Sequence, residues 1–145
     1  MQDTIERTIE IPGTIEAVWT ALTTAEGIRS WFGDEAEIDL KAGGEARFGW
    51  TEYEASSHAI VVDVEPPTRF SYRWAATGSE RADTGPSTLV EFTLESTGTG
   101  TSVTVVESGF ASLPPEIYEQ SIEENTSGWK TEMQDLHDYL AAVDA

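Results

Sequence analysis

The order of the predicted strands and helices along this chain is the feature that most constrains its fold. Seven segments alternate between apolar and polar residues, and a long amphipathic segment follows the last of them. Alternation is typical of half-buried β-strands, whereas apolar residues spaced by three and four predict a helix with one apolar face. The predicted strands are Thr4–Ile11, Glu35–Leu40, Glu45–Glu54, His58–Val64, Arg69–Trp74, Ser87–Glu95 and Thr101–Ser108.

Two short helices are predicted after the first strand, because Pro12-Gly13 ends that strand and Thr14 is suited to cap a helix. The closing helix begins near Pro114-Pro115. Its predicted apolar stripe is Ile122, Thr126, Trp129, Met133, Leu136, Leu140 and Val143. Its predicted opposite face carries Glu123, Glu124, Lys130, Glu132, Asp135 and Asp138.

The element order predicts an α+β fold over residues 1–145 as a single domain. We expect a curved antiparallel sheet of about seven strands wrapped around the long C-terminal helix, because the sheet is the only large apolar surface available to that helix. Alternation also predicts which strand residues face this helix. They are Ala46, Phe48, Trp50, Glu52, His58, Ile60, Val62, Val64, Phe70, Tyr72, Trp74, Val90, Phe92, Leu94, Val103, Val105 and Glu107.

The charge of the chain excludes several classes of partner. Eight lysines and arginines stand against 27 acidic residues, a formal net charge of −19. Such a surface repels nucleic-acid phosphates and anionic membranes, and neither is expected as a partner. The acidity indicates either an ordinary solvated face or adaptation to a salt-rich cytoplasm, in which salt screens the repulsion. With no cysteine and no signal-like N-terminus, a cytoplasmic protein is the simplest expectation.

Several short stretches, in their order and spacing, resemble one protein family. They are Ile11–Thr23, Trp31-Phe32-Gly33, Gly43-Gly44, Val64–Phe70, Ser87–Phe92, Ser108-Gly109-Phe110 and Gly128-Trp129. They are similar to proteins named as homologues of the activator of heat shock protein 90 ATPase. That family lies within the START-like (SRPBCC) superfamily, which includes polyketide cyclases and birch-pollen-allergen-like proteins. The resemblance implies a helix-grip fold, in which the sheet and the C-terminal helix can enclose an apolar cavity.

Aromatic and polar side chains on the predicted inner face are the candidate ligand contacts. A largely apolar pocket with a few converging polar groups is typical of small-molecule sites. The candidates are Phe32, Trp50, Glu52, His58, Tyr72, Trp74, Glu107, Phe110 and Trp129. Of these, Glu107, His58 and Tyr72 are also candidate acid–base groups. If Glu107 is buried, desolvation should raise its pKa, which would suit proton transfer. No motif for a metal, a cofactor or a nucleophilic catalyst is present, so neither a metal nor a cofactor is expected.

Three functions stay open from the sequence. The first is a protein that binds a small apolar or aromatic molecule without catalysis. The second is an enzyme resembling polyketide cyclases that uses Glu107, His58 or Tyr72. The third is a co-chaperone-like role toward another protein, which the family name alone suggests. A monomer or a homodimer is compatible with the sequence, the latter through an exposed strand such as Glu35–Leu40.

Overall fold

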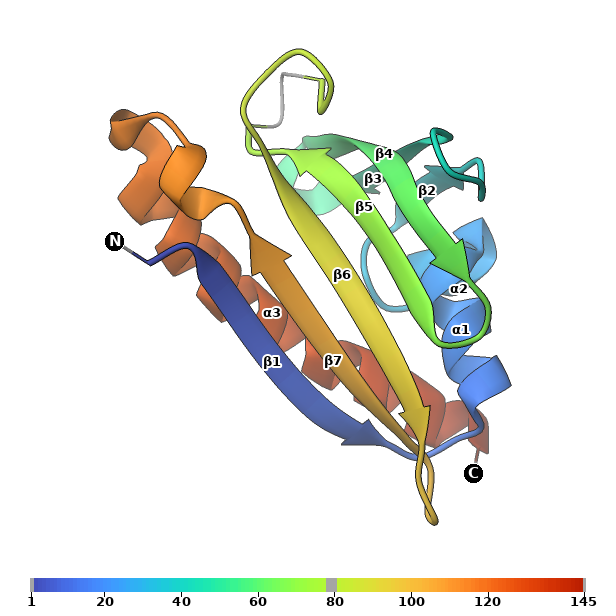
Figure 1. The fold of residues 1–145 in the computed structure, drawn as a ribbon. Helices are drawn as coiled ribbons and strands as arrows, with labels where there is room; N and C mark the ends of the chain where they lie inside the picture. The colour runs from blue at the N-terminus through green and yellow to red at the C-terminus, as the bar shows by residue number, and fades with distance from the viewer. Residues whose placement is uncertain (1, 78–80, 145) are drawn as a thin grey trace.

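A seven-stranded antiparallel sheet curves around one long helix (Figure 1). The computed structural model describes residues 2–77 and 81–144. The strand order in the sheet is β1-β7-β6-β5-β4-β3-β2. The strands are β1 (Thr4–Ile11), β2 (Glu35–Ile38), β3 (Glu45–Trp50), β4 (Ala55–Glu65), β5 (Arg69–Ala75), β6 (Ser87–Ser96) and β7 (Thr101–Ser108). The helices are α1 (Ile15–Thr23), α2 (Ala25–Arg29), the 3-10 turns η1 (Thr51–Tyr53) and η2 (Phe110–Ser112), and α3 (Pro115–Asp144).

The paired strands β6 and β7 show how alternation builds the inner face of the sheet. The antiparallel register places Val90 opposite Glu107 and Phe92 opposite Val105. All four side chains are buried, as the sequence predicts. Residues directly opposite each other share one face of a sheet. The register therefore sets the Glu107 carboxylate among apolar neighbours in the middle of the core.

Helix α3 lies along the concave face of the sheet, behind β1, β7 and β6 in the view of Figure 1. The predicted stripe is confirmed by four buried residues, Trp129, Met133, Leu136 and Leu140. The prediction was wrong at Thr126, which is exposed, and at Val143, which is 62% exposed. Asn125, four residues before Trp129, takes the inward position instead of Thr126, because its amide reaches Glu107.

The inner face of β4 differs from the prediction. Ala59 and Val61 are buried, whereas Val62 is 39% exposed. The pairing with β5 shifts between Val61 and Asp63, a β-bulge that changes which side chains face inward. Val64, beyond the bulge, packs against the core opposite Phe70. The predicted inward face was therefore wrong at His58, Ile60 and Val62, and it was confirmed only at Val64.

Strand β3 ends at Trp50, four residues earlier than predicted, because the chain turns there. Asp34 accepts hydrogen bonds from both the backbone N–H of Thr51, at 2.9 Å, and the hydroxyl of Thr51. These bonds hold η1 as a 3-10 turn, which carries Glu52 out of the strand. Glu52 is exposed rather than aligned with Phe48 and Trp50.

The predicted pair of short helices after β1 is confirmed. Thr14 caps α1 by accepting a hydrogen bond from the N–H of Ala17 at 3.1 Å. Helix α1 buries Val18, Ala21 and Leu22, and the indole of Trp31 donates to the carbonyl of Ala21 at 2.8 Å. This contact anchors the segment Trp31-Phe32 that reaches the candidate site. No helix in residues 2–77 and 81–144 is long and apolar enough to cross a membrane.

Candidate ligand-binding groove

Aromatic rings from four separate segments meet between the sheet and α3. Phe32 stacks on Trp74 of β5 and on Trp129 of α3, with ring centroids 6.0 Å and 5.8 Å away. The two indoles stack on each other at 5.7 Å. Trp50, at the end of β3, makes a T-shaped contact with Phe32, with ring centroids 5.3 Å apart. We call these four side chains the aromatic cluster. Offset and edge-on pairs of this kind are favourable beyond the area that they bury.

The aromatic cluster lines a groove of about 1000 Å³ that opens beside the middle of α3. Many of its other lining residues are exposed, so the groove communicates with solvent instead of forming the enclosed cavity expected from the sequence. Apolar walls with a few polar groups suit a small molecule. The remaining lining residues are Tyr53, Ala55, Gln120, Glu123, Glu124, Asn125, Ser127, Gly128, Thr131 and Glu132.

Glu107 lies directly behind this lining and is 0% exposed. Its Oε1 accepts a hydrogen bond of 2.8 Å from the indole of Trp129, and its Oε2 accepts one of 2.9 Å from the indole of Trp74. Thr88 donates its hydroxyl at 2.5 Å, and the amide of Asn125 donates to both oxygens at 3.0 and 2.9 Å. Every one of these partners is a neutral donor. The hydrogen bonds solvate the carboxylate but supply no opposing charge.

This network fixes the two tryptophans of the groove. Trp74 and Trp129 each turn the indole N–H inward to Glu107 while the ring lines the groove. A hydrogen bond to a charged acceptor is stronger than one between neutral groups, so the ring orientation is held firmly. Glu107 is therefore a positioning residue for the groove, and it does not line the groove itself.

Two other ionisable groups near the groove have shifted pKa values. Burial, followed by the charges of Glu107 and Glu132, raises the pKa of the Tyr72 hydroxyl well above its usual value. Burial, followed by a hydrogen bond with Asp135 and the charge of that residue, raises the pKa of Glu132 to about 8. Glu132 Oε2 is buried and has no hydrogen-bond partner among the described residues. Glu132 was predicted on the solvent face of α3, and the structure instead places it half-buried in the groove wall.

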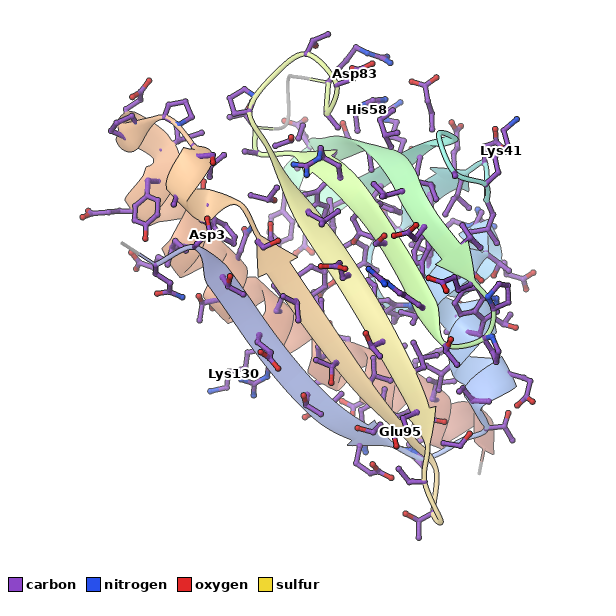
Figure 2. All side chains as sticks on the ribbon, in the orientation of Figure 1. Asp3, Lys41, His58, Asp83, Glu95 and Lys130 are labelled. Atoms are coloured by element: carbon purple, nitrogen blue, oxygen red, sulfur yellow. The ribbon has the colours of Figure 1, made fainter. Side chains whose placement is uncertain are left out.

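The structure places His58 away from the groove. Its Nδ1 accepts a hydrogen bond of 2.9 Å from the N–H of Ala82, and its Nε2 lies 2.9 Å from Glu45 Oε1. Figure 2 shows His58 close to Asp83, beside the β5–β6 loop. Residues 78–80, between β5 and β6, lie outside the described residues. His58 thus ties this loop to β4 and does not approach the aromatic cluster.

The nine candidate contacts fall into three groups. Phe32, Trp50, Trp74 and Trp129 line the groove together. Glu107, Tyr72 and Phe110 are buried and do not line the groove. Glu52 lines a smaller adjoining pocket on η1, and His58 lies elsewhere.

The sequence missed Thr88, which donates to Glu107, and the ten groove-lining residues outside the aromatic cluster, among them Asn125, Gly128 and Glu132. Helical spacing from Trp129 identifies Asn125 as a residue of the inner face, since it lies one turn earlier. Alternation could have found Thr88, since it lies two residues before Val90 on the same face of the predicted strand. No sequence signal reveals the burial of Glu132. No group of three or more histidine, cysteine or acidic residues in the described part of the chain has metal-binding geometry.

The sheet, the gripped C-terminal helix and the groove between them define a START-like, helix-grip protein. Residues 12–141 match the family described as Activator of Hsp90 ATPase homolog 1-like protein, and the chain belongs to that family. A search of curated proteins found no match to this sequence.

Solved structures show the same fold at low sequence identity. MLL2253 from Mesorhizobium loti is 23% identical over 98% of this chain and 99% of its own, with a TM-score of 0.83. The Aha1 dimer from Colwellia psychrerythraea is 19% identical over 96% of each chain, with a TM-score of 0.78. DynU16, a protein in the dynemicin biosynthetic locus, is 24% identical over 97% of this chain and 48% of its own, with a TM-score of 0.79. At this identity the likeness establishes the fold alone.

Proposed function

We propose that this protein binds a small, largely aromatic or apolar molecule in the groove beside α3, and does so without catalysis. One observation carries the proposal: four aromatic side chains from distant segments converge on one groove of about 1000 Å³. A volume of this order matches small-molecule sites. Their convergence offers a ligand both stacking and edge contacts.

Gly128 supports this proposal independently. Glycine inside a helix destabilises it by about 1 kcal/mol relative to alanine. A Cβ added at Gly128 would meet no atom within 4 Å, so close packing does not require the glycine. Gly128 lines the groove, where any side chain would occupy the space that a ligand needs. The glycine is therefore explained by the groove that it keeps open.

Native mass spectrometry of protein purified from its own host in high salt tests the proposal. We expect a stoichiometric small molecule on the wild type and its loss from Gly128→Leu, which fills the groove. Thr126→Leu places the same leucine side chain at an exposed neighbouring position outside the groove and should keep the molecule. Equal retention by the two variants would contradict a ligand in this groove.

An acid–base enzyme is the second candidate, and Glu132 is the observation that favours it. A carboxyl with a pKa of about 8 in a groove wall suits proton transfer near neutral pH. The earlier candidates suit this role less well. Glu107 is occupied by four donor groups, the pKa of Tyr72 is raised away from neutrality, and His58 is remote. If the bound molecule is turned over, Glu132→Gln should abolish turnover and retain binding. Unchanged turnover would exclude this role.

A co-chaperone-like role rests on the family description alone. A titration of this protein into a chaperone ATPase assay tests it directly. An unchanged ATPase rate would dismiss that role without affecting the ligand proposal.

A further inference from the structure

The ionisable side chains that line the groove in the described part of the chain are all acidic. Three carboxyl groups line it, those of Glu123, Glu124 and Glu132, of which Glu132 is largely protonated at neutral pH. No lysine, arginine or histidine among the described residues lines it. Among the described residues, no cationic side chain forms an ion pair with any of the three. The two lysines lie elsewhere: Lys41 on the β2–β3 turn, and Lys130 on α3 outside the groove lining (Figure 2).

A further negative charge, that of Glu107, lies behind the aromatic lining. Glu107 is fully buried and receives only neutral donors, so its charge is solvated but not cancelled. Three of its four partners, Trp74, Asn125 and Trp129, line the groove themselves. Only one side chain therefore separates the charge of Glu107 from a ligand in the groove. The low dielectric of this region screens the electrostatic interaction between them only weakly. The two indoles that donate to it are also polarised toward negative charge on their ring faces.

The aromatic rings of the groove favour a positively charged ligand, as these carboxylates do. The face of an indole attracts a positive group within about 6 Å of its centre, and the attraction grows when water is excluded. Glu132 Oε2, buried and without a described partner in the groove wall, is an acceptor that a donor on the ligand can satisfy.

We infer that the ligand of this groove is a small organic cation, an amine or quaternary ammonium compound with an aromatic or apolar body. The inference rests on the proposed function and names its ligand class. The apolar body contacts the aromatic cluster, and the positive group lies toward the carboxylates of α3. An anionic aromatic molecule of the same shape is repelled by Glu107 and by the groove carboxylates.

The protonation of Glu132 provides a second readout of the same contact. In the ligand-free groove its pKa of about 8 keeps much of it protonated at neutral pH. A bound cation lowers that pKa, so binding releases a proton. Several other ionisable groups face Glu132 or line the pocket beside it, and they set the background for this release. They are Asp135 on α3, Tyr72 on β5, Arg29 on α2, Asp34, and Glu52 on η1.

Isothermal titration calorimetry with three probes that share a phenyl ring tests the inference. The probes are benzyltrimethylammonium, benzyl alcohol and phenylacetate. Titrations are run in 0.5 M KCl, where the Debye length is about 4 Å and the diffuse field of the chain is screened. We expect benzyltrimethylammonium to bind at least about tenfold more tightly than benzyl alcohol, and phenylacetate to bind least. Repetition at pH 7.5 in two buffers of different ionisation enthalpy should detect proton release with the cation and none with benzyl alcohol.

A pair of variants with equal net charge separates the groove from the general acidity. Glu123→Gln with Glu124→Gln should weaken benzyltrimethylammonium binding about three- to tenfold and leave benzyl alcohol unchanged. Glu6→Gln with Glu95→Gln removes two exposed carboxylates outside the groove and should change neither.

Each other outcome has a definite meaning. Equal or tighter binding of benzyl alcohol overturns the cation inference and leaves the proposed function standing. Equal weakening in both double variants assigns the effect to net charge and overturns the inference as well. Failure of every probe to bind the wild type better than Gly128→Leu overturns the inference and the proposed groove together.

Discussion

The indole of Trp129 on α3 donates a 2.8 Å hydrogen bond to the buried carboxylate of Glu107 on β7. This bond joins the gripped helix to the centre of the sheet. Asn125, one turn earlier on α3, bonds to the same carboxylate. One acidic residue therefore both attaches the helix and orients the aromatic lining of the groove.

Replacement of Glu107 by glutamine should destabilise the fold by about 3 kcal/mol. The carboxylate accepts from four donor groups, whereas a glutamine amide offers one acceptor oxygen and turns an NH2 group toward donors. Urea unfolding followed by far-UV circular dichroism measures the change. Glu95→Gln, on the exposed end of β6, is the matched control and should stay within about 0.5 kcal/mol of the wild type. Equal stability of the two variants would show that Glu107 does not hold α3.

Glu132 should make the protein less stable as the pH rises from about 4.5 to about 8. Its folded pKa of about 8 lies above the ordinary value of 4.5, so the folded state binds more protons than the unfolded state throughout this window. The stabilisation is full below pH 4.5 and is lost as the carboxyl ionises. Glu132→Gln stays neutral and should be more stable than the wild type by about 2–4 kcal/mol at pH 8.5, a range below the full value of the pKa shift because solvent screens this partly exposed carboxylate. The difference should be much smaller at pH 5.

Denaturant unfolding at pH 5, 7 and 8.5 measures this difference at constant ionic strength. Glu119→Gln, exposed on the same helix, controls for the loss of one negative charge. A difference between Glu132→Gln and the wild type that is independent of pH would contradict the raised pKa.

Alanine at Gly128 should stabilise the protein by about 0.5–1 kcal/mol, because it removes a glycine from a helix interior and its Cβ meets open space. Thermal unfolding monitored by circular dichroism is sufficient to detect this gain. A loss of stability would mean that the glycine is required by packing, and the argument that it keeps a groove open would fail.

Salt should stabilise the folded chain strongly. At a net charge of −19, self-repulsion opposes the compact state, and molar salt screens it. We expect Tm to rise steeply between dilute and 2 M KCl. Sucrose at matched osmolality controls for excluded-solute effects. A flat response to KCl would contradict adaptation of the acidic surface to a salt-rich cytoplasm.

The fold could be predicted from the sequence because its signals are local and repeated. Alternation in β6 and β7 predicts the buried face residue by residue, and the spacing of Trp129, Met133, Leu136 and Leu140 predicts the buried stripe of α3. Alternation fails in β4, where a bulge near Val62 reverses the inward side within one apolar run. Because consecutive residues of this strand are apolar, both of its faces look alike in the sequence, and no pattern marks the position of the bulge.

The candidate site was harder to predict because many of the residues that form it are polar residues on α3. Asn125 and Glu132 have the character of solvent-facing residues, and their burial depends on partners in other elements. His58 is the reverse case, a residue that was predicted to face inward and does not. Its position in an apolar run predicts an inward side chain, whereas the hydrogen bond from Ala82 holds it on the β5–β6 loop. In both cases contacts with other elements of the fold decide whether the side chain is buried, and the residue pattern of one helix or strand carries no information about such contacts.

The indole N–H resonances of the five tryptophans test the groove most directly. In a 15N-labelled sample titrated with benzyl alcohol and then benzyltrimethylammonium, we predict saturable shifts at Trp50, Trp74 and Trp129, which line the groove. Trp19 and Trp31 do not line it and serve as internal controls. Shifts confined to the three groove residues and absent from Gly128→Leu would support a ligand site beside α3. Uniformly small shifts at all five, or shifts led by Trp19 and Trp31, would contradict it.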